Sequence, residues 1–281
     1  MPKIIAISNQ KGGVGKTTTA INLASSLAIL NQRTLLIDAD PQANATSGLG
    51  VDFNIITKSF YDALIGEATM AETLLQTSCP LLHISPSHID LVGAELELID
   101  IPNREKLLKI ALQPIKDNYD FIIIDCSPSL GLITLNALTT ADSVLVPVQC
   151  EYFALEGLGK LLKTIKLVQG RYNLNLSLEG ILLTMYDSRL RLAQQVSVDL
   201  REHFGNTVFE TIIRRNSKIA EAPSYGQSVI LFSPQSSGAI SYLDLASEVL
   251  NNNNIDITNI NQREVQLRIK EIIKNNNNIE Q

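Results

Sequence analysis

The feature that most constrains this sequence is a glycine-rich run placed between a strand-like segment and a helix-like segment. Ile4 to Ser8 is apolar and β-branched, and residues 9–18 read N-Q-K-G-G-V-G-K-T-T. The residues that follow place small and apolar side chains at helical spacing, at Ala20, Leu23, Ala24 and Leu27. A strand, a glycine turn and a helix in this order predict an α/β fold in which parallel strands are joined by helical crossovers.

Residues 11–18 have the composition of a loop that binds phosphate groups. Glycine lets backbone N–H groups turn toward an anion without an obstructing side chain, and the N-terminus of the following helix adds a partial positive charge. In such a loop Lys16 reaches the β- and γ-phosphates, the Thr17 hydroxyl binds Mg²⁺, and Thr18 reaches the α-phosphate. We therefore predict that ATP is bound by Lys11, Gly12, Gly13, Val14, Gly15, Lys16, Thr17 and Thr18.

Three aspartates follow two of the apolar runs. Asp38 and Asp40 come after Leu35 to Ile37, and Asp125 comes after Phe121 to Ile124. Ligands of an open parallel sheet bind beyond the carboxyl ends of its strands, so we expect these carboxylates beside the phosphate loop. A lone aspartate at a strand end more often caps a turn, but three in register with this loop favour a magnesium site. We predict that Asp125 holds a metal-bound water, that Asp38 supports the metal shell, and that Asp40 positions the attacking water.

Further short apolar runs predict the other strands of the same domain. They are Thr34 to Asp38, Leu81 to Ser85, Phe121 to Asp125, Val144 to Val148 and Gly180 to Tyr186. Amphipathic segments of helical length lie between them, and the runs are almost wholly apolar, as expected when helices cover both faces of a sheet. The sequence predicts one P-loop NTPase domain over residues 1–250, built on a single doubly wound, mostly parallel sheet with helices on both faces.

The composition changes after Leu250. Asn251 to Asn254 and Asn275 to Asn278 are low-complexity asparagine runs, and they bracket residues 263–274, a candidate for a short helix. We expect residues 251–281 to be an Asn-rich, largely mobile tail.

Composition restricts where this protein works. Its apolar runs are far shorter than the roughly 20 residues that span a bilayer, and the N-terminus has no signal-peptide pattern, so we expect a cytoplasmic protein. Cys79, Cys126 and Cys150 have no metal-ligand spacing and are expected to be reduced core residues. The net charge is −6. Ten basic and six acidic residues lie between Leu155 and Lys218, so this stretch carries +4 within an acidic chain.

The phosphate loop departs from the ordinary pattern G-x-x-x-x-G-K-[ST] because Gln10 stands where glycine is expected and Lys11 follows it. The resulting K-G-G-x-G-K-T-T resembles the deviant Walker A motif of the ParA/MinD family. Further matches to the chromosomal ParA (Soj) subgroup are D-A-D-P-Q-A-N-A-T-S-G at 38–48, E-Y-F-A-L-E-G-L at 151–158, T-M-Y-D-S-R at 184–189, and the segment 216–226. Together these matches spread from residue 3 to about residue 250.

The resemblance implies an ATPase with Mg²⁺ as its metal and Lys11, Lys16 and Asp40 as its catalytic residues. Lys11 would reach across an ATP-dependent homodimer to the nucleotide of the partner. The dimer would bind double-stranded DNA non-specifically through positions that match Arg189 and Lys218, and a ParB-type centromere-binding protein would stimulate hydrolysis and release. Such a protein partitions chromosomes or plasmids and associates with the nucleoid.

Arg214 and Arg215 extend the predicted DNA-binding surface, because they lie close to Lys218 at a strand-to-helix connection. Basic side chains bind DNA phosphates without reading sequence, although any one of them could equally belong to a solvated helical face. Arg214 stands where the family commonly has proline in I-P-R-N, and Cys126-Ser127-Pro128-Ser129 has one proline where the family usually has two. The adenine-side contacts of the family come partly from this segment, and the resemblance therefore assigns such a contact to Asn216 rather than to Arg214.

Three other functions fit the sequence less well. A MinD-like ATPase would hold an amphipathic helix against a membrane, and Val265, Ile269, Ile272 and Ile273 do share a stripe. No aromatic residue accompanies them and Asn runs flank the segment, so we expect no stable membrane association. A redox protein like the nitrogenase iron protein would need cysteine ligands at a spacing that is missing here. A pure interaction module is disfavoured because every catalytic position is filled.

Overall fold

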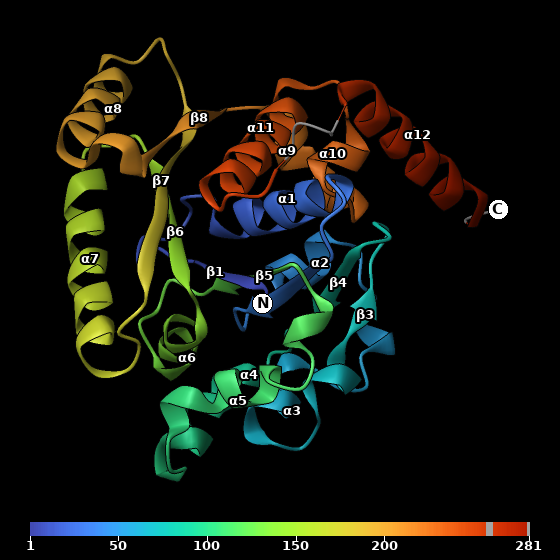
Figure 1. The fold of residues 1–281 in the computed structure, drawn as a ribbon, viewed down its shortest axis with the longest axis vertical. Coiled ribbons are helices and arrows are strands. Elements are labelled where there is room, and N and C mark those ends of the chain that lie inside the picture. The colour runs from blue at the N-terminus through green and yellow to red at the C-terminus, as the bar shows by residue number, and fades with distance from the viewer. Residues whose placement is uncertain (257–260, 280–281) are drawn as a thin grey trace.

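The structure is a computed structural model that describes residues 1–256 and 261–279. Eight strands form one sheet in the order β3-β4-β2-β5-β1-β6-β7-β8, with helices on both faces (Figure 1). The strands are β1 Lys3–Ile7, β2 Thr34–Ala39, β3 Leu75–Gln76, β4 Leu82–Ser85, β5 Phe121–Cys126, β6 Ser143–Gln149, β7 Ser177–Tyr186 and β8 Val208–Arg214. All neighbouring strands are parallel except the antiparallel pair β3 and β4. The predicted doubly wound, mostly parallel sheet is confirmed.

Twelve α-helices and seven short 3-10 helices accompany the strands within the described ranges. The α-helices are α1 Lys16–Ile29, α2 Asn44–Gly48, α3 Phe60–Ile65, α4 Leu91–Glu97, α5 Leu107–Leu112, α6 Leu132–Thr140, α7 Ala154–Arg171, α8 Arg191–Phe204, α9 Ser217–Glu221, α10 Val229–Phe232, α11 Ser237–Asn252 and α12 Gln262–Ile279. The 3-10 helices are η1 Phe53–Ile55, η2 Met70–Thr73, η3 Leu98–Asp100, η4 Arg104–Lys106, η5 Lys116–Asn118, η6 Gly205–Thr207 and η7 Ala222–Tyr225.

Six of the eight strands coincide with the predicted apolar runs, and the two edge strands do not. β3 has only two residues, which is too short for a periodic pattern. β8 mixes apolar and polar residues and leaves Glu210 and Arg214 exposed, because a strand at the edge of the sheet is only partly covered.

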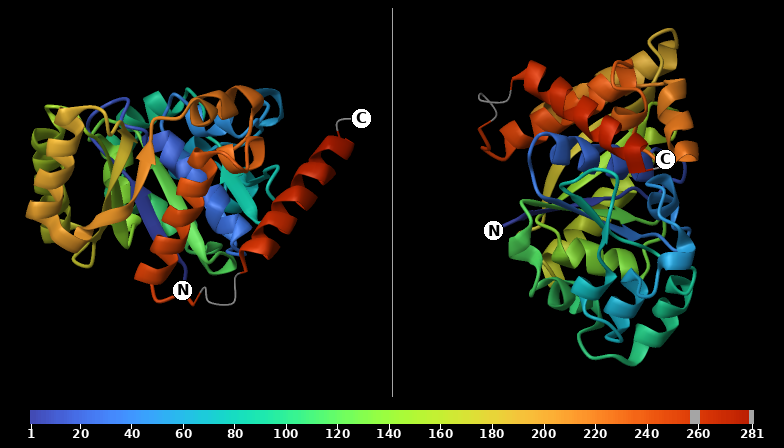
Figure 2. Two further views of the ribbon diagram at one scale, coloured as in Figure 1. Left: turned by 90° about the horizontal axis from the view of Figure 1, so that it is seen from above. Right: turned by 90° about the vertical axis from the view of Figure 1, so that its right-hand side faces the viewer.

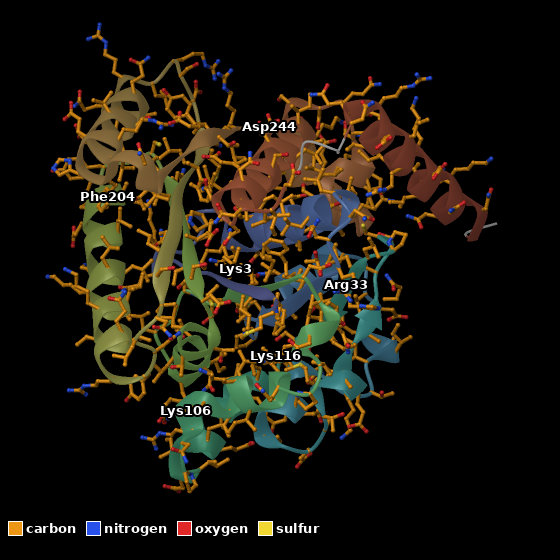
Figure 3. All side chains as sticks on the ribbon, viewed as in Figure 1. Lys3, Arg33, Lys106, Lys116, Phe204 and Asp244 are labelled. Carbon is orange, nitrogen blue, oxygen red and sulfur yellow. The ribbon has the colours of Figure 1, made fainter. Side chains whose placement is uncertain are left out.

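Two hydrophobic cores lie on opposite faces of the sheet because successive side chains of a strand point to opposite sides. In β1, Ile4 and Ala6 pack with helices α3 to α8, whereas Ile5 and Ile7 pack with α1, α10, α11 and α12. Side chains fill the space between the sheet and both helical layers (Figure 3). This double cover explains why the central strands are apolar on both faces.

The C-terminal segment differs from the expected mobile tail. α12 runs from Gln262 to Ile279, beyond the candidate helix 263–274. It is docked on the domain because Val265, Ile269 and Ile272 are buried in the same core as α1 and α10. Arg268 Nη1 also donates to the carbonyl oxygen of Ile29 at 2.5 Å, at the C-terminal end of α1. Figure 2 shows the far end of α12 projecting from the body of the molecule.

The three cysteines are buried and free, as predicted. Burial raises the pKa of Cys79 to about 12 and that of Cys150 to about 11, so these thiols stay protonated at neutral pH. Among the described helices, none is long and apolar enough to cross a membrane.

Docking of α12 can be tested with Ile269→Ala, which removes a fully buried side chain. We expect a loss of about 2–4 kcal/mol of unfolding free energy, since the cavity would form inside a packed core. Leu267→Ala on the same helix is the matched control, because Leu267 is 51% exposed and should change stability little. Chemical denaturation measures both variants, and equal midpoints would show that α12 is undocked in solution.

Candidate functional site

A pocket of about 700 Å³ lies at the carboxyl ends of the central strands. The phosphate loop forms one wall, and the others are formed by the segments that follow β2 and β5, by the start of α4 and by Met185 near the end of β7. The lining residues are Gly12, Gly13, Gly15, Lys16, Thr17, Thr18, Asp40, Pro41, Gln42, Asn44, Leu91, Val92, Ser127, Pro128, Ser129, Ile133 and Met185. Six residues of the predicted phosphate loop and Asp40 therefore share one cavity.

The loop has the backbone geometry of an anion cradle. Gly13 and Gly15 adopt φ values of 72° and 86°, which residues other than glycine rarely adopt. A Cβ atom on Gly12 or Gly13 would meet nothing within 4 Å, so this part of the loop faces open space. Val14 is buried instead, and its carbonyl oxygen accepts from the Thr184 hydroxyl at 2.8 Å, which ties the loop to β7.

Lys16 starts α1 at the base of the pocket. Its side chain is largely buried, and Nζ donates to the carbonyl oxygen of Lys11 at 3.2 Å. Burial lowers the pKa of Lys16, although the nearby carboxylates of Asp125 and Asp40 act in the opposite direction. A bound phosphate group would restore the negative surroundings that a buried ammonium requires.

Asp125 is the best-placed residue for a divalent cation. It lies opposite Asp38 in the register of β5 and β2, and both are fully buried. Burial, and then the neighbouring Asp38, raise the pKa of Asp125 well above its ordinary value. The Thr17 hydroxyl is near enough to lower this pKa, but neither carboxylate oxygen has a partner in good hydrogen-bond geometry within the described chain. A buried carboxylate with two free oxygens beside a threonine hydroxyl fits Mg²⁺ held directly or through water.

Asp38 has a different role in the structure because its oxygens are already occupied. Oδ2 accepts from the backbone N–H and the hydroxyl of Thr46 at 2.8 and 2.7 Å, and Oδ1 accepts from the N–H of Asp40 at 3.2 Å. Burial raises the pKa of Asp38 to about 6. Asp38 thus holds the turn that places the Asp40 side chain in the pocket wall.

Lys11 does not line the pocket. Its Nζ lies 2.6 Å from Glu151 Oε2, and its side chain is 34% exposed. Its backbone N–H donates to Asn9 Oδ1 at 3.0 Å, which orients the start of the loop. The cation that distinguishes this loop from the ordinary pattern is therefore paired with Glu151 and lies outside the pocket lining of its own chain.

Asn216, predicted on the adenine side, is likewise outside the pocket lining. It caps α9, since its Oδ1 accepts from the Lys218 N–H and its Nδ2 donates to the Ser237 hydroxyl, both at 2.8 Å. Conversely, Leu91, Val92 and Met185 line the pocket and were not predicted. Met185 lies in T-M-Y-D-S-R, so that motif could have indicated it, whereas nothing in the sequence marks Leu91 or Val92.

The predicted DNA-binding residues lie at the carboxyl ends of β7 and β8. Arg189 Nη2 contacts Asp187 at 2.7 Å, and Arg215 is also near this carboxylate, since both cations lower its pKa. Arg214 is the last residue of β8, and Lys218 lies in the first turn of α9. The fold therefore gathers Arg189 and Arg215, which are distant in the sequence, at one edge of the sheet.

The buried carboxylates predict a pH dependence of stability. A carboxyl whose pKa is raised by folding stabilises the fold when protonated, so the contribution of Asp38 is present below its unfolded value of 3.8 and lost as the pH rises through about 6. We expect the metal-free protein to lose on the order of 3 kcal/mol over this interval. Asp125→Asn should lessen the loss, because it removes a second buried carboxyl whose pKa folding raises. Denaturation midpoints measured across this pH range check the prediction, and equal losses in wild type and variant would contradict a contribution from Asp125.

Comparisons with known proteins identify the family of this chain. Residues 2–178 match the family described as AAA domain. The chain is 52% identical over 252 residues to the sporulation initiation inhibitor protein Soj of Bacillus subtilis, covering 90% of this chain and 100% of that protein. It is 54% identical over 248 residues to the chromosome partitioning protein ParA of Myxococcus xanthus, covering 88% of each.

Solved structures share the fold. A Mycobacterium smegmatis structure, described as cobyrinic acid a,c-diamide synthase with a bound ATP analogue and magnesium, has a TM-score of 0.79 and 37% identity. The alignment covers 90% of this chain and 96% of that one. The cell division ATPase MinD of Pyrococcus furiosus has a TM-score of 0.75 and 26% identity, covering 89% and 99%. With a deviant phosphate loop and high identity to Soj and ParA over almost the whole domain, this chain belongs to the ParA/MinD family of deviant Walker A ATPases, in its chromosomal ParA (Soj) subgroup.

Proposed function

We propose that this chain is a partition ATPase whose ATP-bound form pairs with a second copy, binds duplex DNA without reading its sequence, and leaves DNA after hydrolysis. A ParB-type centromere-binding protein stimulates that hydrolysis. The partition role is supported by the 52% identity to Bacillus subtilis Soj. The observation that supports the dimer is the position of Lys11. Its ammonium lies outside the pocket of its own chain and contacts the exposed Glu151.

ATP and Mg²⁺ are the substrate and the metal of this ATPase. The backbone N–H groups of the glycine loop and the Lys16 ammonium bind the phosphates, and Lys16 stabilises the charge that develops on the transferred phosphoryl group. Thr17 and Asp125 would hold Mg²⁺, and the bound ion would supply positive charge to offset that of the phosphates. Asp40, in the pocket wall, orients the attacking water.

Lys11 completes the site of the partner copy. Because the Lys11 side chain is one third exposed and its ion pair with Glu151 is at the surface, little free energy is needed to release it. A second cation delivered to the phosphates by another chain makes nucleotide binding and pairing interdependent.

The DNA surface consists of Arg189, Arg214, Arg215 and Lys218. All four are exposed at the carboxyl ends of β7 and β8 and in the first turn of α9, within the stretch that carries +4. Contacts of this kind neutralise phosphates and release counterions, which favours DNA of any sequence.

Two alternatives have weaker support. The apolar stripe that a MinD-like protein would offer to a membrane is buried here at Val265, Ile269 and Ile272, so α12 has no free apolar face of this kind. We therefore propose a cytoplasmic, nucleoid-associated protein without stable membrane association. The second alternative is the synthase activity named in the description of the Mycobacterium smegmatis structure. This chain is 37% identical to that protein, which is well below its identity to Soj and ParA, so the partition role has the stronger support.

The proposal is tested by measuring binding to random-sequence duplex DNA in ATP and in ADP, with Lys11→Ala as the decisive variant. We expect wild type to form a dimer and bind DNA only in ATP, as seen by light scattering and fluorescence anisotropy. Lys11→Ala should bind ATP but remain a monomer off DNA, because its cation acts in the partner's site. Lys58→Ala, which removes an exposed cation paired with Asp62, is the control. An ATP-dependent dimer of Lys11→Ala would refute the role of Lys11.

Asp40→Ala tests the catalytic assignment. The variant should bind ATP and dimerise, but turn over at least about 100-fold more slowly, since a positioned acid or base contributes about that much. It should consequently stay on DNA. Phosphate release measures turnover, and a normal rate would transfer the catalytic role to another residue.

A further inference from the structure

Both cations that the family resemblance assigns to DNA are held by acids of their own chain. Arg189 Nε and Nη2 donate to the two oxygens of Asp187 at 2.9 and 2.7 Å. Lys218 Nζ lies 2.6 Å from Glu221 Oε2. Arg191 and Arg214, in the same region, form no ion pair with any residue that the structure describes.

The turn after β7 holds Asp187 in place, whereas Glu221 lies beside Lys218 because of its position in α9. Asp187 is only 18% exposed, and its Oδ1 also accepts from the backbone N–H of Arg189 at 3.0 Å, which fixes the carboxylate in the turn after β7. Glu221 lies one helical turn from Lys218 in α9, and the Phe232 ring lies 5.6 Å from the Lys218 ammonium. Each cation therefore has a built-in partner in the absence of DNA.

These contacts have a consequence for DNA binding. A phosphate that approaches Arg189 or Lys218 must displace the carboxylate or share the cation with it. Both cations are exposed and each pair costs little to break, so the main effect is the negative charge that stays close to the phosphate. A cation that is already paired with a carboxylate also releases fewer counterions from DNA. One copy of the surface therefore binds DNA more weakly than its number of basic residues indicates. Two copies joined in a dimer regain affinity because the second set of contacts forms at a high effective concentration.

We propose that Asp187 and Glu221 are counter-charges that keep a single copy of this chain off DNA, so that stable binding requires the ATP-bound dimer. This inference rests on the proposed binding of DNA through Arg189 and Lys218. It adds two acidic residues that make such binding depend on the nucleotide.

The test is the double variant Asp187→Asn/Glu221→Gln, which keeps the size and most hydrogen bonds of both side chains while removing their charges. Its affinity for random-sequence duplex DNA is measured against salt in ADP and in ATP. Asp117→Asn/Glu202→Gln is the matched control, because both acids are exposed and form no ion pair among the described residues. The control makes the same change in net charge away from the two pairs.

In ADP we expect the double variant to bind DNA at least tenfold more tightly than wild type, with a log–log salt slope steeper by up to about 0.9 for each freed cation. Adding Arg189→Ala should remove part of this gain. The counter-charge proposal is overturned if the double variant stays off DNA in ADP, or if the control gains as much. A wild type that fails to bind DNA even in ATP would instead refute the proposed DNA binding itself, and this inference with it.

Discussion

Two carboxyl groups lie side by side in the centre of the sheet, and the arrangement of the pocket depends on how they are accommodated. Asp38 and Asp125 are partners on neighbouring strands and have no contact with solvent. Asp38 is satisfied by Thr46 and by the backbone of Asp40, so it organises the turn that carries Asp40. Asp125 is left with free oxygens. The desolvation that makes this pair unfavourable without a cation is what makes the site favourable for one.

The elements at the carboxyl ends of the strands connect the nucleotide pocket with the proposed DNA surface. Thr184 in β7 holds the phosphate loop through Val14, and β7 continues to the turn that contains Asp187. A second connection is a close approach of two glycines, since a Cβ atom on Gly226 would lie 2.6 Å from the Gly50 Cα. Gly50 follows α2, which is anchored on Asp38, and Gly226 ends the turn after α9. The turn at Asp40 and the segment that follows α9 are thus connected through α2 and the two packed glycines.

Local patterns predicted the phosphate loop, the three aspartates and six strands because each depends on a short stretch of chain with a strong physical signature. The pocket residues Leu91 and Val92 could not be predicted, since their position depends on how α4 packs across the sheet. The partners of Lys11 and Arg189 were also unpredictable from spacing alone. The apolar stripe of α12 is visible in the sequence, but a stripe does not indicate what it packs against. In the structure it packs against the core of the same domain.

The strand order also determines when the centre of the sheet becomes available during synthesis. β1 emerges first from the ribosome, yet its neighbours are β5 and β6, and its register begins with Lys3 opposite Phe121. An apolar strand that leads into the phosphate loop must therefore wait, unpaired, for a partner that comes much later in the chain. Such long-range pairing slows folding and leaves apolar side chains and an unpaired strand edge open to aggregation.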